Sequence, residues 1–332
     1  MEGEGLSNSG TDEMIKQKQL ANKRSMTTSW TRKPACLTVQ IITPKKWLLN
    51  GLWFGPVKPK HLIVWVHGLT SSAFSMGHVV EKLINRDTAV LTFNNRGFGI
   101  VNSISQNKKK NSRTIVAGGA HEVFSECVDD IQGAINFART TGVRDIYLAG
   151  HSTGCQKSVY WASKKSGGKA VRGIILFAPV SDYADLLQRD NGGRRKRLTK
   201  LAQGFLKRGK PHEFLPEPAD VFPWGTFFCD AQRYLSLYTA DSDETIFCYE
   251  QKGKIPKALC AVKVPLLVLW AENDEFADRS AAETAQWFGS HIRSKHEVAI
   301  IPGVSHNFRG REKSVASLLH RWIDSLGNAK PK

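Results

Sequence analysis

One serine of the chain lies between two glycines, in a setting that could make its hydroxyl a nucleophile. Ser152 is the centre of the pattern Gly-x-Ser-x-Gly at residues 150–154. The apolar run 145–149 before it is typical of a buried strand, and the stretch 155–165 after it could form a helix. Glycine permits a sharp strand-to-helix turn, which would expose the serine in front of the positive end of the helix. The alternative is a plain turn.

A serine hydroxyl is a weak nucleophile at neutral pH and needs a general base. Asp274 follows the apolar run 264–270, and His306 follows the last apolar β run, 297–301. Because ligands bind at the carboxyl ends of parallel strands, we expect these two residues and Ser152 at one edge of a sheet. Neutral His306 would accept the proton of Ser152, and Asp274 would hold the other ring nitrogen.

The reaction also needs donors for the negatively charged oxygen that forms when the serine attacks a carbonyl carbon. The backbone N–H groups of Thr153 and of Leu69, in the segment 67–70, are the candidates. Loss of one such donor typically lowers the rate by about 100-fold to 1,000-fold. The sequence therefore predicts an oxyanion site made of backbone groups.

Each assignment has a competitor in the sequence. Glu272 or Asp278 could be the acid, with Asp274 only a helix cap. His291 and His296 compete for the role of base, but they precede a strand instead of following one. His67 is expected to be structural and Cys155 to be a small buried side chain. The sequence suggests no partner for His78, His121, His151, His212 and His320.

The elements that would position these residues alternate between strand and helix after an initial hairpin. Such alternation predicts a mostly parallel sheet with helices on both faces. The strands that we expect lie at 37–42, 47–54, 61–66, 88–93, 145–149, 173–178, 264–270 and 297–301, and the helices at 76–85, 123–141, 155–165, 281–288 and 315–326. The segment 94–120 is expected to be a loop.

The alternation stops between Pro179 and about Val262, a stretch too long for an ordinary connection. One amphipathic helix is expected there, with its apolar face formed by Leu198, Leu201, Phe205 and Leu206. We interpret 181–261 as a cap over the site, inserted before the strand that carries the acid. The α/β core would then comprise 35–180 and 262–328, and residues 1–34, which are polar and aperiodic, would form a flexible N-terminal arm.

The composition of the chain argues against a secreted protein and against a membrane-spanning one. The chain has 332 residues, of which 41% are apolar, and a net charge of +17. The N-terminus has no apolar segment typical of a secretory signal, and no apolar run approaches the roughly 20 residues that span a bilayer. The six scattered cysteines form no Cys-x-x-Cys pair, which favours reduced thiols and a cytoplasmic location.

The charge first suggests a nucleic-acid partner, but no motif of a known nucleic-acid-binding fold accompanies it. Basic residues gather in the stretch from Arg189 to Lys210, which holds nine Lys or Arg and one Asp. We expect no nucleic-acid partner and interpret most of this charge as solvated surface. The alternative is that the stretch borders a site for an anionic substrate.

The motifs above resemble those of the α/β-hydrolase superfamily, from about Thr38 to Leu326. The resemblance includes the segment 67–70, the Asn-Arg-Gly-x-Gly stretch at 95–99 and the order Ser, Asp, His along the chain. The segments 150–156 and 178–182 resemble, more narrowly, a mostly uncharacterised family near the fungal esterases that open fusarinine-type siderophores. The resemblance implies an ester or related acyl substrate, an α-helical cap that selects it, no metal and no organic cofactor.

The sequence therefore predicts an α/β-hydrolase fold and a serine hydrolase that cleaves a carboxylic ester through an acyl-enzyme intermediate. An acyltransferase or a lactonase would use the same residues. A ligand receptor that kept the fold without turnover is a third alternative. The substrate would be a small-molecule ester, polar or anionic, whose acyl chain and alcohol the sequence does not identify, and it predicts no oligomeric state.

Overall fold

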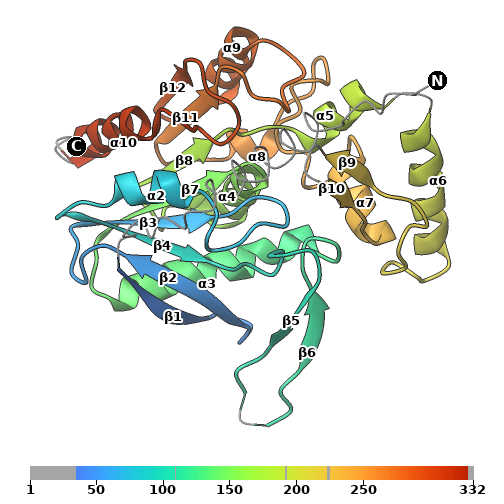
Figure 1. Ribbon diagram of the computed structural model, residues 1–332, viewed down its shortest axis with the longest axis horizontal. Helices are drawn as coiled ribbons and strands as arrows, with labels where there is room; N and C mark the ends of the chain where they lie inside the picture. The colour runs from blue at the N-terminus through green and yellow to red at the C-terminus, as the bar shows by residue number, and fades with distance from the viewer. Residues whose placement is uncertain (1–34, 109, 191–192, 223–224, 328–332) are drawn as a thin grey trace, which may run out of the picture. The chain divides into compact units, whose positions relative to one another are not determined.

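The structure of the protein is a computed structural model that describes residues 35–108, 110–190, 193–222 and 225–327 (Figure 1). The chain divides into two units, Met1–Pro34 and Ala35–Lys332. The predicted flexible arm, residues 1–34, lies outside the described residues. Within the described ranges, no helix is long and apolar enough to cross a bilayer.

An eight-stranded sheet with the order β1-β2-β4-β3-β7-β8-β11-β12 forms the centre of the second unit. The first two strands are antiparallel to each other, β2 is antiparallel to β4, and all later neighbours are parallel. The six parallel strands therefore end at the same edge. The bounds are β1 Cys36–Ile42, β2 Leu48–Phe54, β3 His61–Val66, β4 Thr88–Phe93, β7 Asp145–His151, β8 Gly173–Phe177, β11 Leu266–Ala271 and β12 His296–Ile301.

Helices cover both faces of this sheet, because its central strands are apolar on both sides (Figure 1). On β3, Leu62 and Val64 pack in one apolar cluster with α3, α4 and α9, whereas Ile63 and Trp65 pack in another with α2 and α10. The predicted mostly parallel sheet flanked by helices is confirmed. The helix bounds are α2 Gly77–Leu83, α3 Cys127–Thr140, α4 Thr153–Lys164, α9 Ala281–His291 and α10 Glu312–Gly327, and two short 3-10 turns lie at Phe124–Glu126 and Ser166–Gly168.

The expectation that 94–120 is a loop was wrong, because this segment contains an antiparallel hairpin. Its strands are β5 Asn102–Ser105 and β6 Thr114–Ala117. Ile104 is buried and pairs with Ile115, but the neighbouring strand positions are mostly polar and exposed. With so few apolar positions per strand, the alternation was too short to indicate a strand.

The insertion, which we define as the residues between β8 and β11, has its own apolar cluster. The predicted amphipathic helix is α6 Arg194–Lys207, and its buried side chains are Leu198 and Ala202. Contrary to expectation, Leu206 is exposed, because it lies off the face that packs on the cluster. The insertion also contains α5 Asp182–Arg189, a hairpin of β9 Asp220–Phe222 and β10 Gly225–Phe227, α7 Ala231–Tyr238 and α8 Lys257–Cys260.

A buried network of four charged side chains joins the insertion to the core. Lys157 of α4 lies 2.5 Å from Glu122, and Glu122 also contacts Arg233 of α7 at 3.1 Å. The guanidinium of Arg233 lies 2.5 Å from Glu244. All four side chains are almost inaccessible to solvent. Two cations and two carboxylates balance, so the network carries no net charge when all four are ionised.

Candidate active site

The turn after β7 holds Ser152 in an unusual backbone conformation. Its φ is 55° and its ψ is −128°, and α4 begins at the next residue. The glycines on either side are required, because a Cβ on Gly150 would lie 2.3 Å from the Gly154 carbonyl oxygen, and one on Gly154 would lie 2.2 Å from the carbonyl oxygen of Val66. The chain therefore turns tightly enough to place the serine in front of the N-terminus of α4.

The segment after β3 passes against this turn. A Cβ on Gly68 would lie 2.9 Å from the Cβ of Ser152, so only glycine permits this approach. Leu69 lines the same cavity as Ser152, and Thr153 is the first, buried residue of α4. The two segments that carry the candidate oxyanion donors thus both lie next to the serine.

His306 and Asp274 meet at the carboxyl end of the sheet. The imidazole Nδ1 of His306 donates to Asp274 Oδ2 at 2.8 Å, and both side chains are buried. Asp274 Oδ1 also accepts from the Phe276 backbone N–H at 3.0 Å, which fixes the carboxylate. The two alternative acids have other partners, since Glu272 accepts from the Gly303 N–H and Asp278 pairs with Arg279.

The surroundings of His306 favour its protonated form. Burial lowers the pKa of His306, but the charge of Asp274 and the hydrogen bond to it more than compensate, so the net pKa is raised above 6.5. Because Nδ1 is held by Asp274, the other ring nitrogen, Nε2, remains for proton exchange. This is the arrangement of a general base that is oriented by a carboxylate.

Two further histidines hold the loops of the site in place. The Nε2 of His151 donates to the backbone carbonyl of His306 at 3.1 Å, and the two rings lie 4.8 Å apart. Burial, followed by the charge of His306, lowers the pKa of His151 to about 3. The sequence suggested no partner for His151. As expected, His67 is structural, since its buried ring donates to the Gly68 carbonyl and accepts from the Asn95 N–H.

Ser152 and His306 both line a cavity of about 370 Å³. From the insertion, α5 contributes the carboxyl groups of Asp182 and Asp185 to its wall, and β9 contributes Phe222. Burial, followed by the charge of Glu244, raises the pKa of Asp182 to about 8. The Asp182 carboxyl is therefore largely protonated at pH 7 and can donate a hydrogen bond.

The basic stretch from Arg189 to Lys210 is partly neutralised by carboxylates of the insertion itself. Arg189 forms ion pairs with Asp185 and Asp220. Arg197 forms one with Glu217. Among the described residues that line the 370 Å³ cavity, none is a lysine or an arginine. The charge of this stretch is thus directed toward neighbouring acids and solvent.

The thiol of Cys155 is fully buried beside this site, as expected. Its Sγ contacts the carbonyl oxygens of Gly150 and Phe177. Burial raises the pKa of the Cys155 thiol well above its ordinary value. The thiol is therefore neutral, and its role is to fill space under the turn.

Comparison with known proteins shows which family this chain matches. Residues 116–326 match the family described as "Protein of unknown function (DUF1749)". A UPF0613 protein of Schizosaccharomyces pombe is 25% identical over 216 residues, which cover 59% of this chain and 67% of that protein. The stretch that matches the family, residues 116–326, contains Ser152, Asp274 and His306.

Solved structures share the fold at low sequence identity. The alpha/beta hydrolase GrgF from a Penicillium species superposes with a TM-score of 0.58 and 15% identity, over 88% of this chain and 98% of that one. A soluble variant of the monoglyceride lipase of Saccharomyces cerevisiae, solved with a substrate analog, gives a TM-score of 0.59 and 12% identity, over 91% and 98% of the two chains. The predicted α/β-hydrolase fold is therefore confirmed.

Proposed function

Because this chain belongs to the DUF1749 family and has the α/β-hydrolase fold, we propose that it is a serine hydrolase that cleaves a carboxylic ester or a related acyl bond. The observation that carries the proposal is one cavity lined by a serine on a strained turn and by a histidine held by a buried carboxylate. Ser152, His306 and Asp274 would be nucleophile, general base and orienting acid.

In the first half-reaction, the Oγ of Ser152 attacks the carbonyl carbon of the ester while His306 Nε2 takes the hydroxyl proton. The N–H groups of Leu69 and Thr153 would stabilise the tetrahedral oxyanion. When the bond between the carbonyl carbon and the alcohol oxygen breaks, the imidazolium returns its proton to the leaving alcohol. The acyl group remains on the serine.

In the second half-reaction, water replaces the alcohol. His306 removes a proton from the water as the water oxygen attacks the acyl carbon. The bond between the acyl carbon and Ser152 Oγ then breaks, and His306 returns the proton to the serine. No metal or organic cofactor takes part in this scheme. An acyltransferase differs only in the nucleophile of this step, and a lactonase only in a substrate whose leaving alcohol stays attached.

The cavity wall narrows the class of substrate. A volume of about 370 Å³ suits a small molecule. A protonated Asp182 would donate a hydrogen bond to an oxygen of the substrate, and Asp185 adds a second carboxyl group. Because Asp185 is paired with Arg189 and no described lining residue is a lysine or an arginine, the wall favours an ester with a polar, uncharged alcohol over an anionic one.

We further propose that residues 181–261 act as a cap, within a core of 35–180 and 262–328. The proposal is supported by the contribution of Asp182, Asp185 and Phe222 to the wall beside the serine. A cap that forms part of the wall would select substrates by shape and polarity. The cytoplasmic location and the absence of a nucleic-acid partner stay predictions.

The first experiment is steady-state hydrolysis of p-nitrophenyl esters from acetate to decanoate by the wild-type chain and by Ser152→Ala. We expect turnover by the wild type and loss of turnover in the variant, because the substitution removes the hydroxyl that would attack the ester. The acyl chain length that is hydrolysed fastest would indicate the size of the part of the cavity that binds the acyl group. Circular dichroism would verify that the variant is folded.

The alternatives predict other outcomes of the same experiment. A ligand receptor would release no more than about one equivalent of product. An acyltransferase would show turnover that rises when an acceptor alcohol is added, with formation of a new ester. Equal turnover by Ser152→Ala and the wild type would contradict the proposed nucleophile.

A further inference from the structure

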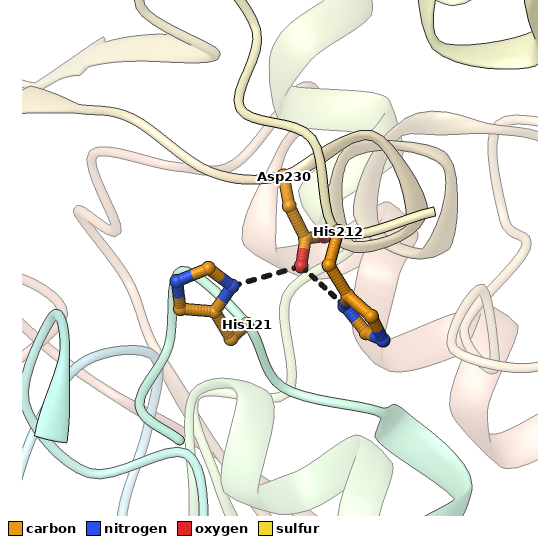
Figure 2. Close-up of side chains that lie close together, drawn as sticks. All are labelled: His121, His212 and Asp230. Carbon is orange, nitrogen blue, oxygen red and sulfur yellow. Dashed lines mark hydrogen bonds and ion pairs between the residues drawn. The ribbon is translucent and has the colours of Figure 1, made fainter. Parts of the chain in front are cut away.

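A second group of side chains with coordinating chemistry lies outside the cavity of Ser152. It consists of His121, in the turn between β6 and α3, His212, in the loop after α6, and Asp230, the residue that precedes α7. Their three ligand atoms lie within 4.8 Å of one another. Figure 2 shows both imidazole rings turned toward the same carboxylate oxygen.

The carboxylate of Asp230 is fixed before any ligand arrives. Its Oδ2 accepts from His121 Nδ1 at 3.0 Å and from His212 Nδ1 at 2.8 Å. Its Oδ1 accepts from the Arg233 backbone N–H at 2.7 Å, which caps α7, and the side chain is completely buried. The His121 ring is held at its edge by Phe214, with ring centroids 4.7 Å apart.

Two imidazole nitrogens and one carboxylate oxygen are the ligands that a divalent transition metal, zinc above all, prefers in proteins. We propose that His121, His212 and Asp230 form a zinc-binding site that links the insertion to the core. Each neutral imidazole would carry its proton on Nε2 in the bound state, so both Nδ1 lone pairs would be available to the ion.

Small movements convert the hydrogen-bonded cluster into this site. Zinc lies about 2.0–2.2 Å from nitrogen and oxygen ligands, so the ligand atoms of a tetrahedral site are about 3.4 Å apart. To reach this spacing, the two Nδ1 to Oδ2 contacts must lengthen slightly, and ligand atoms that are as much as 4.8 Å apart must come closer. The side chain of His212, which is 58% exposed, has the freedom to turn, while Asp230 and His121 stay in place.

The three residues leave a fourth position of a tetrahedral ion open. His121 and His212 line a cavity of about 500 Å³, whose wall also includes the acids Glu122 and Glu126. This cavity and the one beside Ser152 have no described lining residue in common. Water would complete the coordination, and the principal effect of the ion would be to fasten α7 and the loop of His212 to the turn of His121.

The test uses the full chain without a histidine tag, freed of metal by a chelator. Zinc binding is measured by competition with a chromophoric chelator, and Tm is measured with and without zinc. We expect one zinc ion per chain and a rise in Tm. In His212→Ala and His121→Ala, binding should weaken by at least about tenfold and the rise in Tm should disappear. His296→Ala, which removes an exposed histidine of β12, should behave as the wild type.

His212→Gln separates a metal site from a purely hydrogen-bonded cluster. Its amide can still donate to Asp230, but glutamine is a poor zinc ligand. If the cluster only ties the segments together, His212→Gln keeps the wild-type Tm, and zinc changes the Tm of neither protein. That result, or equal zinc affinity of the wild type and His212→Ala, would overturn the proposal. None of these measurements depends on the activity of Ser152.

Discussion

Ser152 occupies a backbone conformation that residues with a side chain rarely adopt. Such strain costs of the order of 1–3 kcal/mol and persists only where the surrounding structure enforces it. Here the close approach of Gly150 to Gly154, and of Gly154 to the end of β3, enforces the turn. The serine is therefore held in position before a substrate binds, which spares the reaction the cost of orienting it.

The raised pKa of His306 predicts the pH dependence of the proposed reaction. The base must be neutral to accept a proton, so kcat/KM should fall as the pH decreases through the pKa of His306. Because the Asp274 charge and hydrogen bond raise this pKa above 6.5, the acidic limb should have its midpoint above pH 6.5. The measurement is kcat/KM for one ester between pH 5 and 9.

Asp274→Asn is the matched variant for this profile. Without the negative charge of Asp274, burial, which lowers the pKa of His306, is opposed only by the weaker effects of Glu275 and Asp182, so the midpoint of the acidic limb should move to lower pH. The rate should also fall by roughly 10⁴-fold, as expected when the imidazole loses its orienting carboxylate. An acidic limb that stays at the same pH in this variant would argue that a group other than His306 is the base.

The sequence could predict those residues of the candidate site whose place depends only on where a strand ends. Ser152 follows β7 directly, and Asp274 and His306 come within a few residues of the ends of β11 and β12, so the topology brings all three to one edge. The partner of His151 lies 155 residues away, and that of His121 lies 109 residues away. No spacing rule relates such residues, since the fold of the core creates the contact of His151 and the packing of the insertion on the core creates that of His121.

At the scale of elements, α4 both places its N-terminus behind Ser152 and contributes a buried charge, that of Lys157, to the network. Its Lys157 is fully buried, which is tolerable only because Glu122 neutralises it. Glu122 in turn is shared with Arg233 of α7. The helix that positions the nucleophile is thus connected through charges to the insertion that forms part of the cavity wall.

Arg233→Met should destabilise the protein strongly. The substitution leaves Glu244 buried without its cation and removes one of two partners of Glu122. Breaking a buried pair in this way typically costs about 3–5 kcal/mol of the free energy of unfolding. Urea denaturation followed by tryptophan fluorescence would measure it.

Arg197→Met is the control for this substitution. Arg197 pairs with Glu217 at the surface of α6, where solvent screens the attraction, so its loss should leave the urea midpoint nearly unchanged. Equal destabilisation by both substitutions would show that the effect is general to arginine removal. A negligible effect of Arg233→Met would mean that the network contributes little to stability.

Most elements were predictable because their apolar residues recur with a clear period. The strand β3 is apolar after His61, and the wholly buried strand was predicted with its observed bounds. The hairpins β5–β6 and β9–β10 were missed, since each strand has only three or four residues. Such strands form because they pair with each other and pack on neighbouring elements, and their own sequences hardly encode them.

At the scale of the whole molecule, the net charge of +17 creates a positive field that attracts anions at low salt. At about 0.15 M salt this field is screened beyond about 8 Å, so only charges near the cavity affect whether an anionic substrate binds. There Asp182 is largely protonated and Asp185 is paired with Arg189, while Arg197 is paired with Glu217. The charge therefore need not indicate an anionic substrate.

We expect an ester with an anionic alcohol to be hydrolysed no faster than its neutral analogue of the same size at physiological salt. The comparison is kcat/KM for both esters at about 0.02 M and 0.3 M salt, where screening differs most. A preference of more than about tenfold for the anionic ester, lost at high salt, would instead assign the basic stretch to substrate capture.

The buried network also limits how this protein can be recombined. Replacing the insertion with that of a relative would bring new residues against Glu122 and Lys157, which belong to the core. Unless the new insertion supplied a cation and an acid at the positions of Arg233 and Glu244, the chimera would bury unmatched charges. Insertion and core are therefore coupled electrostatically, and exchange of the insertion requires either matching charges on the new segment or exchange of the counterions in the core.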